Sequence, residues 1–284
     1  MDNVKGSCLC GAVSWRAPLR NKEVFFCHCS QCRRHHGSIG AYISSSIPSE
    51  LVKMQDNIRW YNSSPEGERG FCVICGSKLF WRKKGSETLY PDAGSLDGEN
   101  NMLHPKSHIF VGSKGDYYDI TDHLPCYEAQ STNSIAEHVP AKKEPQHEKT
   151  IHRGRCLCGK VHFTITGQMR PIVYCHCGQC RHSHGHYPGY SAARQSQMKL
   201  EGEENIQWYR SSPGAQRGFC HHCGSSLFWQ ADKEDFISIT AGCMDMPTDL
   251  KEGWHIYIKD KADWYSLTDG LLTFPGTTPS NAQF

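Results

Sequence analysis

The chain has 284 residues, a length that fits one large domain or two of ordinary size. Its 31 Lys and Arg are nearly balanced by 29 Asp and Glu, so no global field attracts nucleic acid or an anionic membrane. No apolar run reaches the length of a membrane span, and residues 1–6 contain no hydrophobic stretch of the signal-peptide kind. We therefore expect a soluble, cytoplasmic protein without nucleic-acid or membrane partners.

Sixteen cysteines are the most unusual feature of the composition. A reducing cytosol does not maintain a disulfide framework, so the spacing of these cysteines has to decide between metal binding and thiol catalysis. Hydrophobic residues make up 38% of the chain, below the usual share of a globular protein, which predicts modest cores. A bound metal is one way to stabilise a small core.

The sequence also contains an internal repeat. Seven cysteines of the first half recur 148 positions later, and other residues keep the same offset, as Arg69 and Arg217 do. By His108 and His255 the offset has become 147. Chance does not produce such agreement, so we interpret the chain as a tandem duplication. The expected parts are a first domain at 1–127, a second at 153–276 and a tail at 277–284.

A polar segment at 128–152 separates the two copies. It is rich in Ser, Thr, Asn, Gln, Pro, Lys and Glu and has no apolar periodicity. Such a segment buries too little surface to offset its ordering entropy, which predicts a flexible linker. One helical turn at 135–137 is the alternative.

The predicted elements are mostly short strands. In chain order, residues 11–15 alternate in strand fashion after a Cys-Gly turn, residues 30–36 suit one short helix, and 77–81 and 108–111 are β-prone runs. The second copy repeats the series at 159–165, 178–184 and 225–229, with a further run at 236–240. Gly, Pro and Ser clusters separate these runs. An all-β fold with many turns is therefore expected.

Two short cysteine pairs in each copy suit a closed metal site. A Cys-x-Cys pair and a distant Cys-x-x-Cys pair are each followed by glycine, which lets the backbone turn tightly around a metal. Two such turns make a tetrahedral zinc site whose binding energy contributes to folding. The expected ligands are Cys8, Cys10, Cys72 and Cys75 in the first copy, and Cys156, Cys158, Cys220 and Cys223 in the second.

Three further cysteines in each copy form a compact Cys-His-Cys-x-x-Cys run: Cys27, Cys29 and Cys32, and then Cys175, Cys177 and Cys180. With the first site closed, no fourth shared cysteine remains, and an open position marks catalytic zinc. Filling by His28 or His176, and a second structural site, are the alternatives. Three thiolates leave zinc a weak Lewis acid, better suited to holding an exogenous thiolate than to activating water. Arg33 and Arg181, next in sequence, are candidates to attract an anionic thiol.

These motifs resemble the glutathione-dependent formaldehyde-activating enzyme family, whose domain is shared with centromere protein V. The family pattern is Cys-x-Cys-Gly, then Cys-His-Cys-x-x-Cys-Arg, then Arg-x-Phe-Cys-x-x-Cys-Gly-Ser. The first copy carries it at residues 8–11, 27–33 and 69–77, and the second at 156–159, 175–181 and 217–225. Later Gly-x-x-Asp and His-Ile elements also fit, at 94–97 with 108–109 and at 242–245 with 255–256.

The resemblance implies two tandem zinc-bound β-tent domains, each with one structural zinc on the paired cysteines and one glutathione-linked zinc on the trio. It also implies reversible carbon–sulfur bond chemistry, in which glutathione adds to formaldehyde. We therefore expect a zinc-dependent carbon–sulfur lyase with up to two zinc ions per domain, and with a small thiol and a small electrophile as partners. Arg69 and Arg217 are further candidates to hold a carboxylate of the thiol.

The main alternative is a non-catalytic, zinc-stapled scaffold that binds a protein partner. It needs only the closed site, whereas both copies keep the trio. Cys126 and Cys243 are expected to be free or core residues, and the histidines near the trios, at 35, 36, 182, 184 and 186, are expected in exposed loops. Trp264 occupies a family tryptophan position that Tyr117 takes in the first copy, which favours the second copy as the working one. The sequence does not reveal a general acid.

Overall fold

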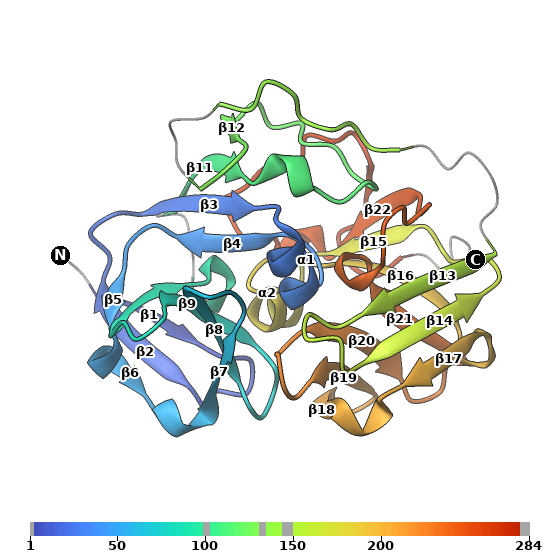
Figure 1. The fold of residues 1–284 in the computed structure, drawn as a ribbon, viewed down its shortest axis with the longest axis horizontal. Coiled ribbons are helices and arrows are strands. Elements are labelled where there is room, and N and C mark those ends of the chain that lie inside the picture. The colour runs from blue at the N-terminus through green and yellow to red at the C-terminus, as the bar shows by residue number, and fades with distance from the viewer. Residues whose placement is uncertain (1–2, 99–102, 131–134, 144–149, 279–284) are drawn as a thin grey trace.

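The computed structural model describes residues 3–98, 103–130, 135–143 and 150–278. Within this part of the chain the regular structure is mostly strand, with α-helices only at Ser30–His36 (α1) and Gly178–His184 (α2). Figure 1 shows two β-rich halves side by side, with both short helices where the halves meet. The all-β fold and the duplication are confirmed, and the two predicted helical segments have the predicted bounds.

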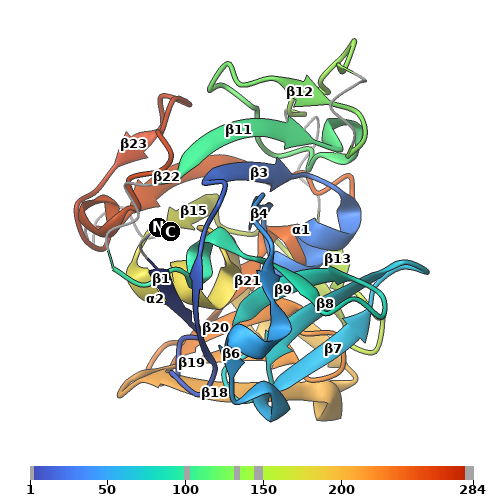
Figure 2. The same ribbon diagram turned by 90° about the vertical axis from the view of Figure 1, so that its left-hand side faces the viewer.

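Each copy folds into a small sheet and a larger strand system. The first copy has sheets β1–β2–β6, β5–β10–β9–β8–β7 and β12–β11–β3–β4. Their bounds in chain order are Asn3–Ser7, Ser14–Pro18, Glu23–Cys27, Gly40–Ile43, Ile47–Pro48, Val52–Lys53, Ile58–Asn62, Gly67–Cys72, Lys78–Lys83, Thr88–Pro91, His104–Ile109 and Cys126–Tyr127 for β1 to β12. In the turned view of Figure 2, the parallel strands β3 and β11 run side by side in the upper layer.

The second copy has sheets β13–β14–β17 and β18–β19–β20–β21–β16–β15–β22–β23. Their bounds in chain order are Ile151–Arg155, His162–Thr166, Ile172–Cys175, Gly189–Arg194, Met198–Glu201, Ile206–Ser212, Ala215–Cys220, Ser226–Ala231, Phe236–Thr240, Glu252–Ile256 and Leu272–Thr273 for β13 to β23. Here β16 and β21 join the strands into one sheet, whereas β4 and β10 meet only at the bridge between Tyr42 and Asp92. Pro91 occupies the place of Ile239, and without an N–H it cannot continue the ladder.

Strand starts differ from the sequence expectation near the cysteines. The predicted strand at 11–15 begins only at Ser14, because the preceding residues turn around the first cysteine pair. The N–H of Cys8 donates to the carbonyl of Val13, and Gly11 adopts a φ of 75°, which favours glycine. From Ser14 onward alternate side chains are buried, with Trp15 and Ala17 in the core of the first copy. The turn therefore places Cys8 and Cys10 at the end of the sheet.

The two copies form one continuous interface with pseudo-two-fold symmetry. The helix α1 contacts the 3-10 turn Ala241–Cys243 (η7), and α2 contacts the equivalent turn Ala93–Ser95 (η3). The N–H of Gly94 donates to Gly185 O at 2.8 Å, and the N–H of Gly242 donates to Gly37 O at 2.9 Å. Rings of Phe71 and Phe219 meet edge to face in the same interface. The copies therefore pack directly on each other.

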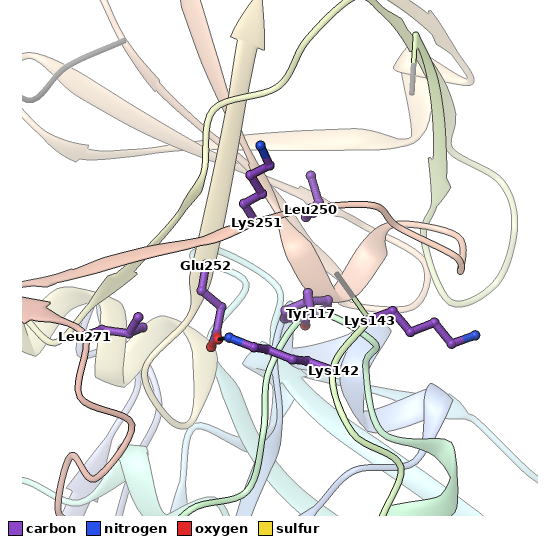
Figure 3. Close-up of a pocket in the computed structure, with 7 residues that line it drawn as sticks. All are labelled: Tyr117, Lys142, Lys143, Leu250, Lys251, Glu252 and Leu271. Carbon is purple, nitrogen blue, oxygen red and sulfur yellow. Dashed lines mark hydrogen bonds and ion pairs between the residues drawn. The ribbon is translucent and has the colours of Figure 1, made fainter. Parts of the chain in front are cut away.

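The described part of the 128–152 segment contacts both copies. Ile135 pairs with Tyr127 in an antiparallel bridge, so the alternative helical turn at 135–137 is not observed. Lys142 Nζ lies 3.0 Å from a carboxylate oxygen of Glu252, and the N–H of Lys143 donates to Asp116 O. Figure 3 shows the ion pair between Lys142 and Glu252 beside a pocket that Tyr117 and Leu250 help to line. The predicted domain boundaries stay predictions, and residues 131–134, 144–149 and 279–284 of the linker and tail lie outside the described residues.

None of the described helices is long and apolar enough to cross a membrane.

The tight approach at Gly242 gives a test of the interface. A Cβ added there would overlap the carbonyl oxygen of Arg33 and the backbone at Gly37, so Gly242→Ala has to push the copies apart. Overpacking of this kind costs about 1–3 kcal/mol. Thermal melts should show a clearly lower Tm for Gly242→Ala than for the control Gly214→Ala, whose added Cβ meets no atom within 4 Å. Equal melting temperatures would show that the copies do not depend on this contact.

Candidate metal and thiol sites

Four thiols meet at the end of the small sheet in each copy. Cys8 and Cys10 lie in the turn between β1 and β2, and Cys72 and Cys75 flank the turn between β8 and β9. The Sγ atoms of Cys8 and Cys10 are 3.4 Å apart, those of Cys10 and Cys72 are 3.8 Å apart, and all four lie within 4.8 Å of one another. Four sulfurs at tetrahedral zinc positions are about 3.8 Å apart. The second copy repeats the arrangement with Cys156, Cys158, Cys220 and Cys223.

The donor set itself calls for a cation. No cysteine of the chain forms a disulfide. Hydrogen bonds from the neighbouring thiols lower the pKa of Cys75, while hydrogen bonding with Cys75 raises the pKa of Cys72. The cluster therefore admits one thiolate easily but not four, because like charges at this spacing repel. Zinc would offset these charges, so the residues fit a closed zinc site that joins two distant turns.

Surrounding donors hold the four sulfurs in place. The backbone N–H of Val13 donates to Cys8 Sγ at 3.3 Å. Ser77 accepts from the N–H of Leu9 at 2.9 Å, and its hydroxyl lies 3.2 Å from Cys75 Sγ. Ser225 does the same for Leu157 and Cys223 in the second copy. Such outer contacts orient metal ligands.

The three remaining cysteines of each copy gather where a strand becomes a helix. Cys27 ends β3, Cys29 caps α1 by accepting from the N–H of Cys32, and Cys32 lies in the first turn. Their Sγ atoms lie within 4.8 Å of one another, as do those of Cys175, Cys177 and Cys180. Within the described residues no fourth Cys, His, Asp or Glu joins either trio. The donor set fits zinc with one ligand position left for another molecule.

The histidine between the first two ligands points away from the trio. His28 hydrogen-bonds through Nδ1 with the Tyr118 hydroxyl at 2.7 Å and through Nε2 with His108 at 2.8 Å. His108 in turn contacts Asp122 at 2.9 Å. Both ring nitrogens are engaged, so His28 does not supply the fourth ligand. His176 is held in the same way by Tyr265, His255 and Asp269.

The candidate arginines divide into two groups. Arg69 Nη2 donates to Cys32 Sγ at 3.1 Å, and Arg217 Nη2 donates to Cys180 Sγ at 3.5 Å. Hydrogen bonds from Cys27 and Cys29, together with the Arg69 guanidinium, hold the pKa of Cys32 well below its ordinary value. The arrangement therefore favours a thiolate at this position even before a metal binds.

The second group lies at the interface between the copies. Arg33 Nη1 donates to the carbonyls of Gly242 and Met244, each at 3.1 Å. Arg181 Nη1 reciprocates with the carbonyls of Gly94 and Leu96. The structure therefore places Arg69 and Arg217 at the trios and gives Arg33 and Arg181 backbone partners in the opposite copy.

A tyrosine beside each trio was missed by the sequence analysis. The hydroxyl of Tyr42 lies 3.7 Å from Cys32 Sγ and 2.9 Å from His36 Nε2. Tyr190, in the second copy, lies 2.7 Å from His184 Nε2, and its oxygen accepts from Arg217 at 3.4 Å. The 148-residue offset between these two tyrosines was the one signal that pointed to them.

The histidines near the trios differ from the expectation of exposed loops. The side chains at 35, 36, 184 and 186 are at most 2% exposed, because both short helices end inside the interface between the copies. His35 Nδ1 hydrogen-bonds with Cys223 O at 3.0 Å, across that interface. Cys243 is fully buried there, as expected for a packing residue.

Trp264 does not distinguish the second copy. It lies in the core of the first copy, 6.0 Å from the ring of Phe26, whereas Tyr117 lies in the core of the second. The ends of the two copies thus cross over, and the preference for the second copy as the working one stays a prediction.

Comparison with known proteins agrees with this geometry. The model of the family described as glutathione-dependent formaldehyde-activating enzyme matches residues 3–113 and again residues 151–260. The chain belongs to this family. A Schizosaccharomyces pombe protein named as an uncharacterized lyase is 29% identical over 124 residues, 43% of this chain and 88% of that protein. A Halomonas elongata protein, provisionally named a glutathione-dependent formaldehyde-activating enzyme, is 28% identical over 145 residues, 47% of this chain and 92% of that protein.

A crystal structure of a Rhodobacter sphaeroides protein matches 31% of this chain and 83% of its own, at 24% identity and a TM-score of 0.27. Membership of the family and the names of the sequence relatives support a glutathione-related lyase. Each of those relatives aligns over most of its own length but less than half of this chain, as expected for a chain that holds two copies of the family domain.

Serine substitutions separate the two kinds of site. Cys72→Ser or Cys220→Ser removes a ligand that joins two distant turns, so its own copy should unfold or melt well below the unaltered protein. Cys29→Ser or Cys177→Ser changes a cluster that is local in sequence and should leave the fold intact. Circular dichroism melts with zinc analysis of each variant provide the measurement. Equal loss of structure in all four variants would show that the structural and functional roles are wrongly divided.

Buried histidines predict a loss of stability in mild acid. Burial lowers the pKa of His35, His184 and His186 well below the ordinary 6.5, and that of His36 to about 4. The unfolded chain takes up these protons near pH 6.5 while the folded chain does not, so their stabilising effect is full above pH 6.5 and is lost as the pH falls toward the folded values. We expect Tm to fall between pH 7 and pH 5 while a chromogenic chelator detects no zinc released from the folded protein. A constant Tm over this range would contradict the statement that these buried histidines stay neutral in the folded protein.

Proposed function

We propose that the protein is a zinc-dependent carbon–sulfur lyase that makes or breaks the bond between glutathione, or a similar small thiol, and a small electrophile such as formaldehyde. The observation that carries this proposal is the three-thiol cluster of each copy, which gathers three metal ligands and no fourth within the described residues. We further propose up to four zinc ions per chain, two in each copy. The glutathione-related names of the family and of the Halomonas elongata relative support the choice of thiol.

Zinc bound by the trio would hold an entering thiol as its thiolate, the nucleophilic form. Arg69 and Arg217 supply buried positive charge beside Cys32 and Cys180, which limits the repulsion between the cysteine thiolates and an anionic thiol. The half-buried Cys29 and Cys177 form the more open side of each trio, while the other ligands are buried. A small thiol would therefore approach from the side of Cys29 or Cys177.

The addition forms one carbon–sulfur bond, breaks the π bond of the carbonyl group and transfers one proton. The sulfur lone pair forms the new carbon–sulfur bond at the carbonyl carbon, the carbonyl π electrons move to oxygen, and that oxygen receives the proton that the thiol gave up. In the reverse direction the hydroxyl loses its proton as the carbon–sulfur bond breaks. The hydroxyl oxygens of Tyr42 and Tyr190 lie beside the trios and are placed to accept a hydrogen bond from the S–H of the entering thiol or from the O–H of the adduct.

Glutathione binding and aldehyde exchange test this function directly. Calorimetry of the zinc-loaded protein should show glutathione binding that is lost in the Cys29→Ser/Cys177→Ser double variant, whose fold is expected to remain. Exchange NMR with glutathione and formaldehyde should show faster thiohemiacetal formation than without protein, and a panel of other small aldehydes extends the test.

The absence of both glutathione binding and rate acceleration would contradict the proposal. It would favour a zinc-stapled scaffold that binds a protein partner. Binding without acceleration of any aldehyde would keep the thiol site and contradict the lyase assignment. Acceleration that survives in the double variant would place the reaction outside the trios.

A further inference from the structure

The two three-cysteine sites are connected through a pair of histidines that cross the interface between the copies. His36 and His184 are the last residues of α1 and α2 and are fully or almost fully buried. The Nδ1 atom of His36 lies 2.7 Å from His184 O, and the Nδ1 atom of His184 lies 2.5 Å from His36 O. Each Nε2 atom faces the tyrosine beside its own trio. One ring thus contacts the opposite copy and a site residue at once.

The contact with the opposite copy determines which ring nitrogen carries the proton. A backbone carbonyl only accepts, so Nδ1 of each histidine has to be the N–H donor. Burial keeps the rings neutral, which leaves Nε2 without a hydrogen and able only to accept. The phenol hydrogen of each tyrosine therefore points to the histidine, and the phenol oxygen turns its lone pairs toward the trio.

Contacts in each copy support this direction. In the second copy, Arg217 Nη1 donates to the Tyr190 oxygen at 3.4 Å, which requires that oxygen to be an acceptor. In the first copy, Asp92 Oδ1 lies 3.6 Å from His36 Nε2, too far to compete with the Tyr42 hydroxyl at 2.9 Å. A copy without its partner would lose the carbonyl that fixes the tautomer, and the phenol would be free to turn its hydrogen toward the trio.

We propose that the two sites are one coupled unit, in which His36 and His184 are positioning residues and the opposite copy fixes the hydrogen-bond direction at each trio. This inference rests on the proposed function only where it concerns the reaction, because the histidine tautomers are a property of the chain itself. The ring of His184 also holds the backbone of His36 at the end of α1 through its hydrogen bond to His36 O. A change of the His184 side chain should therefore move the His36 ring and be felt at the trio of the first copy, which His184 does not touch.

Two substitutions at His184 test the coupling in a full-length Cys177→Ser background, where only the first site reports. His184→Asn keeps an N–H donor near the position of Nδ1 and loses only the hydrogen bond with Tyr190. That tyrosine lies beside the second trio, which Cys177→Ser has already inactivated. His184→Gln keeps a partner for Tyr190 and loses the donor to His36 O. We expect the Gln variant to lower kcat of the first site by roughly 5-fold with little change in KM for the thiol, and the Asn variant to leave both unchanged. Matched thermal melts control for loss of structure.

Long-range ¹H–¹⁵N NMR of the histidine rings gives a readout that does not need activity. Both rings should show the Nδ1–H tautomer in the unaltered protein, and His184→Gln should alter the His36 pattern while His184→Asn should not. An Nε2–H tautomer at His36 would overturn the inference even if the protein is a lyase. The inference would also be overturned if neither substitution changes the activity of the first site or the NMR pattern of His36. If the protein has no lyase activity but shows the predicted tautomers and the predicted response of His36 to His184→Gln, the coupling is supported. Only the proposed function is then contradicted.

Discussion

Repulsion between crowded thiolates is the constraint on which the rest of the structure depends. Each copy brings four sulfurs together in one cluster and three in another, each within 4.8 Å, at distances where simultaneous ionisation needs a cation. Four sulfurs fit a tetrahedral zinc site, and zinc bound there would join Cys8 to Cys75 across the first copy and stabilise the fold. Three sulfurs leave a position for another ligand. We propose that this difference of one cysteine separates a structural site from a functional one.

The duplication has produced two copies that pack on each other but are no longer equivalent. The same helices that carry the trios form the centre of the interface, so the geometry of each site depends on the other copy. At that centre the side chains have diverged: Lys78 donates to Ser226, its own counterpart in the repeat, at 2.7 Å. Asp92 is fully buried beside His36, where the second copy has Thr240. Burial lowers the pKa of Lys78 to about 8 and raises that of Asp92. The pseudo-symmetry is therefore in the backbone more than in the charges.

The sequence predicted those features that depend on neighbouring residues. The cysteine sets and the two short helices follow from local spacing, and the structure has them as predicted. The interface could not be predicted in the same way, because its contacts join residues far apart in the chain, as Arg33 and Gly242 show. A sequence motif places Arg33 next to the trio, but the helix turns its side chain toward the opposite copy. Tyr42 carries no motif, and its role depends on the fold that brings β4 next to α1.

Cadmium-113 NMR tests most directly the claim that one site in each copy is closed and the other open to a thiol. The cadmium-loaded protein should give resonances of two kinds, one typical of four thiolates and one of three thiolates with a lighter fourth ligand. Added glutathione should move only the second kind into the range of four thiolates, and Cys29→Ser/Cys177→Ser should remove that response while the first kind stays unchanged. Resonances of four-thiolate character at every site before any thiol is added, or no response to glutathione, would contradict the account.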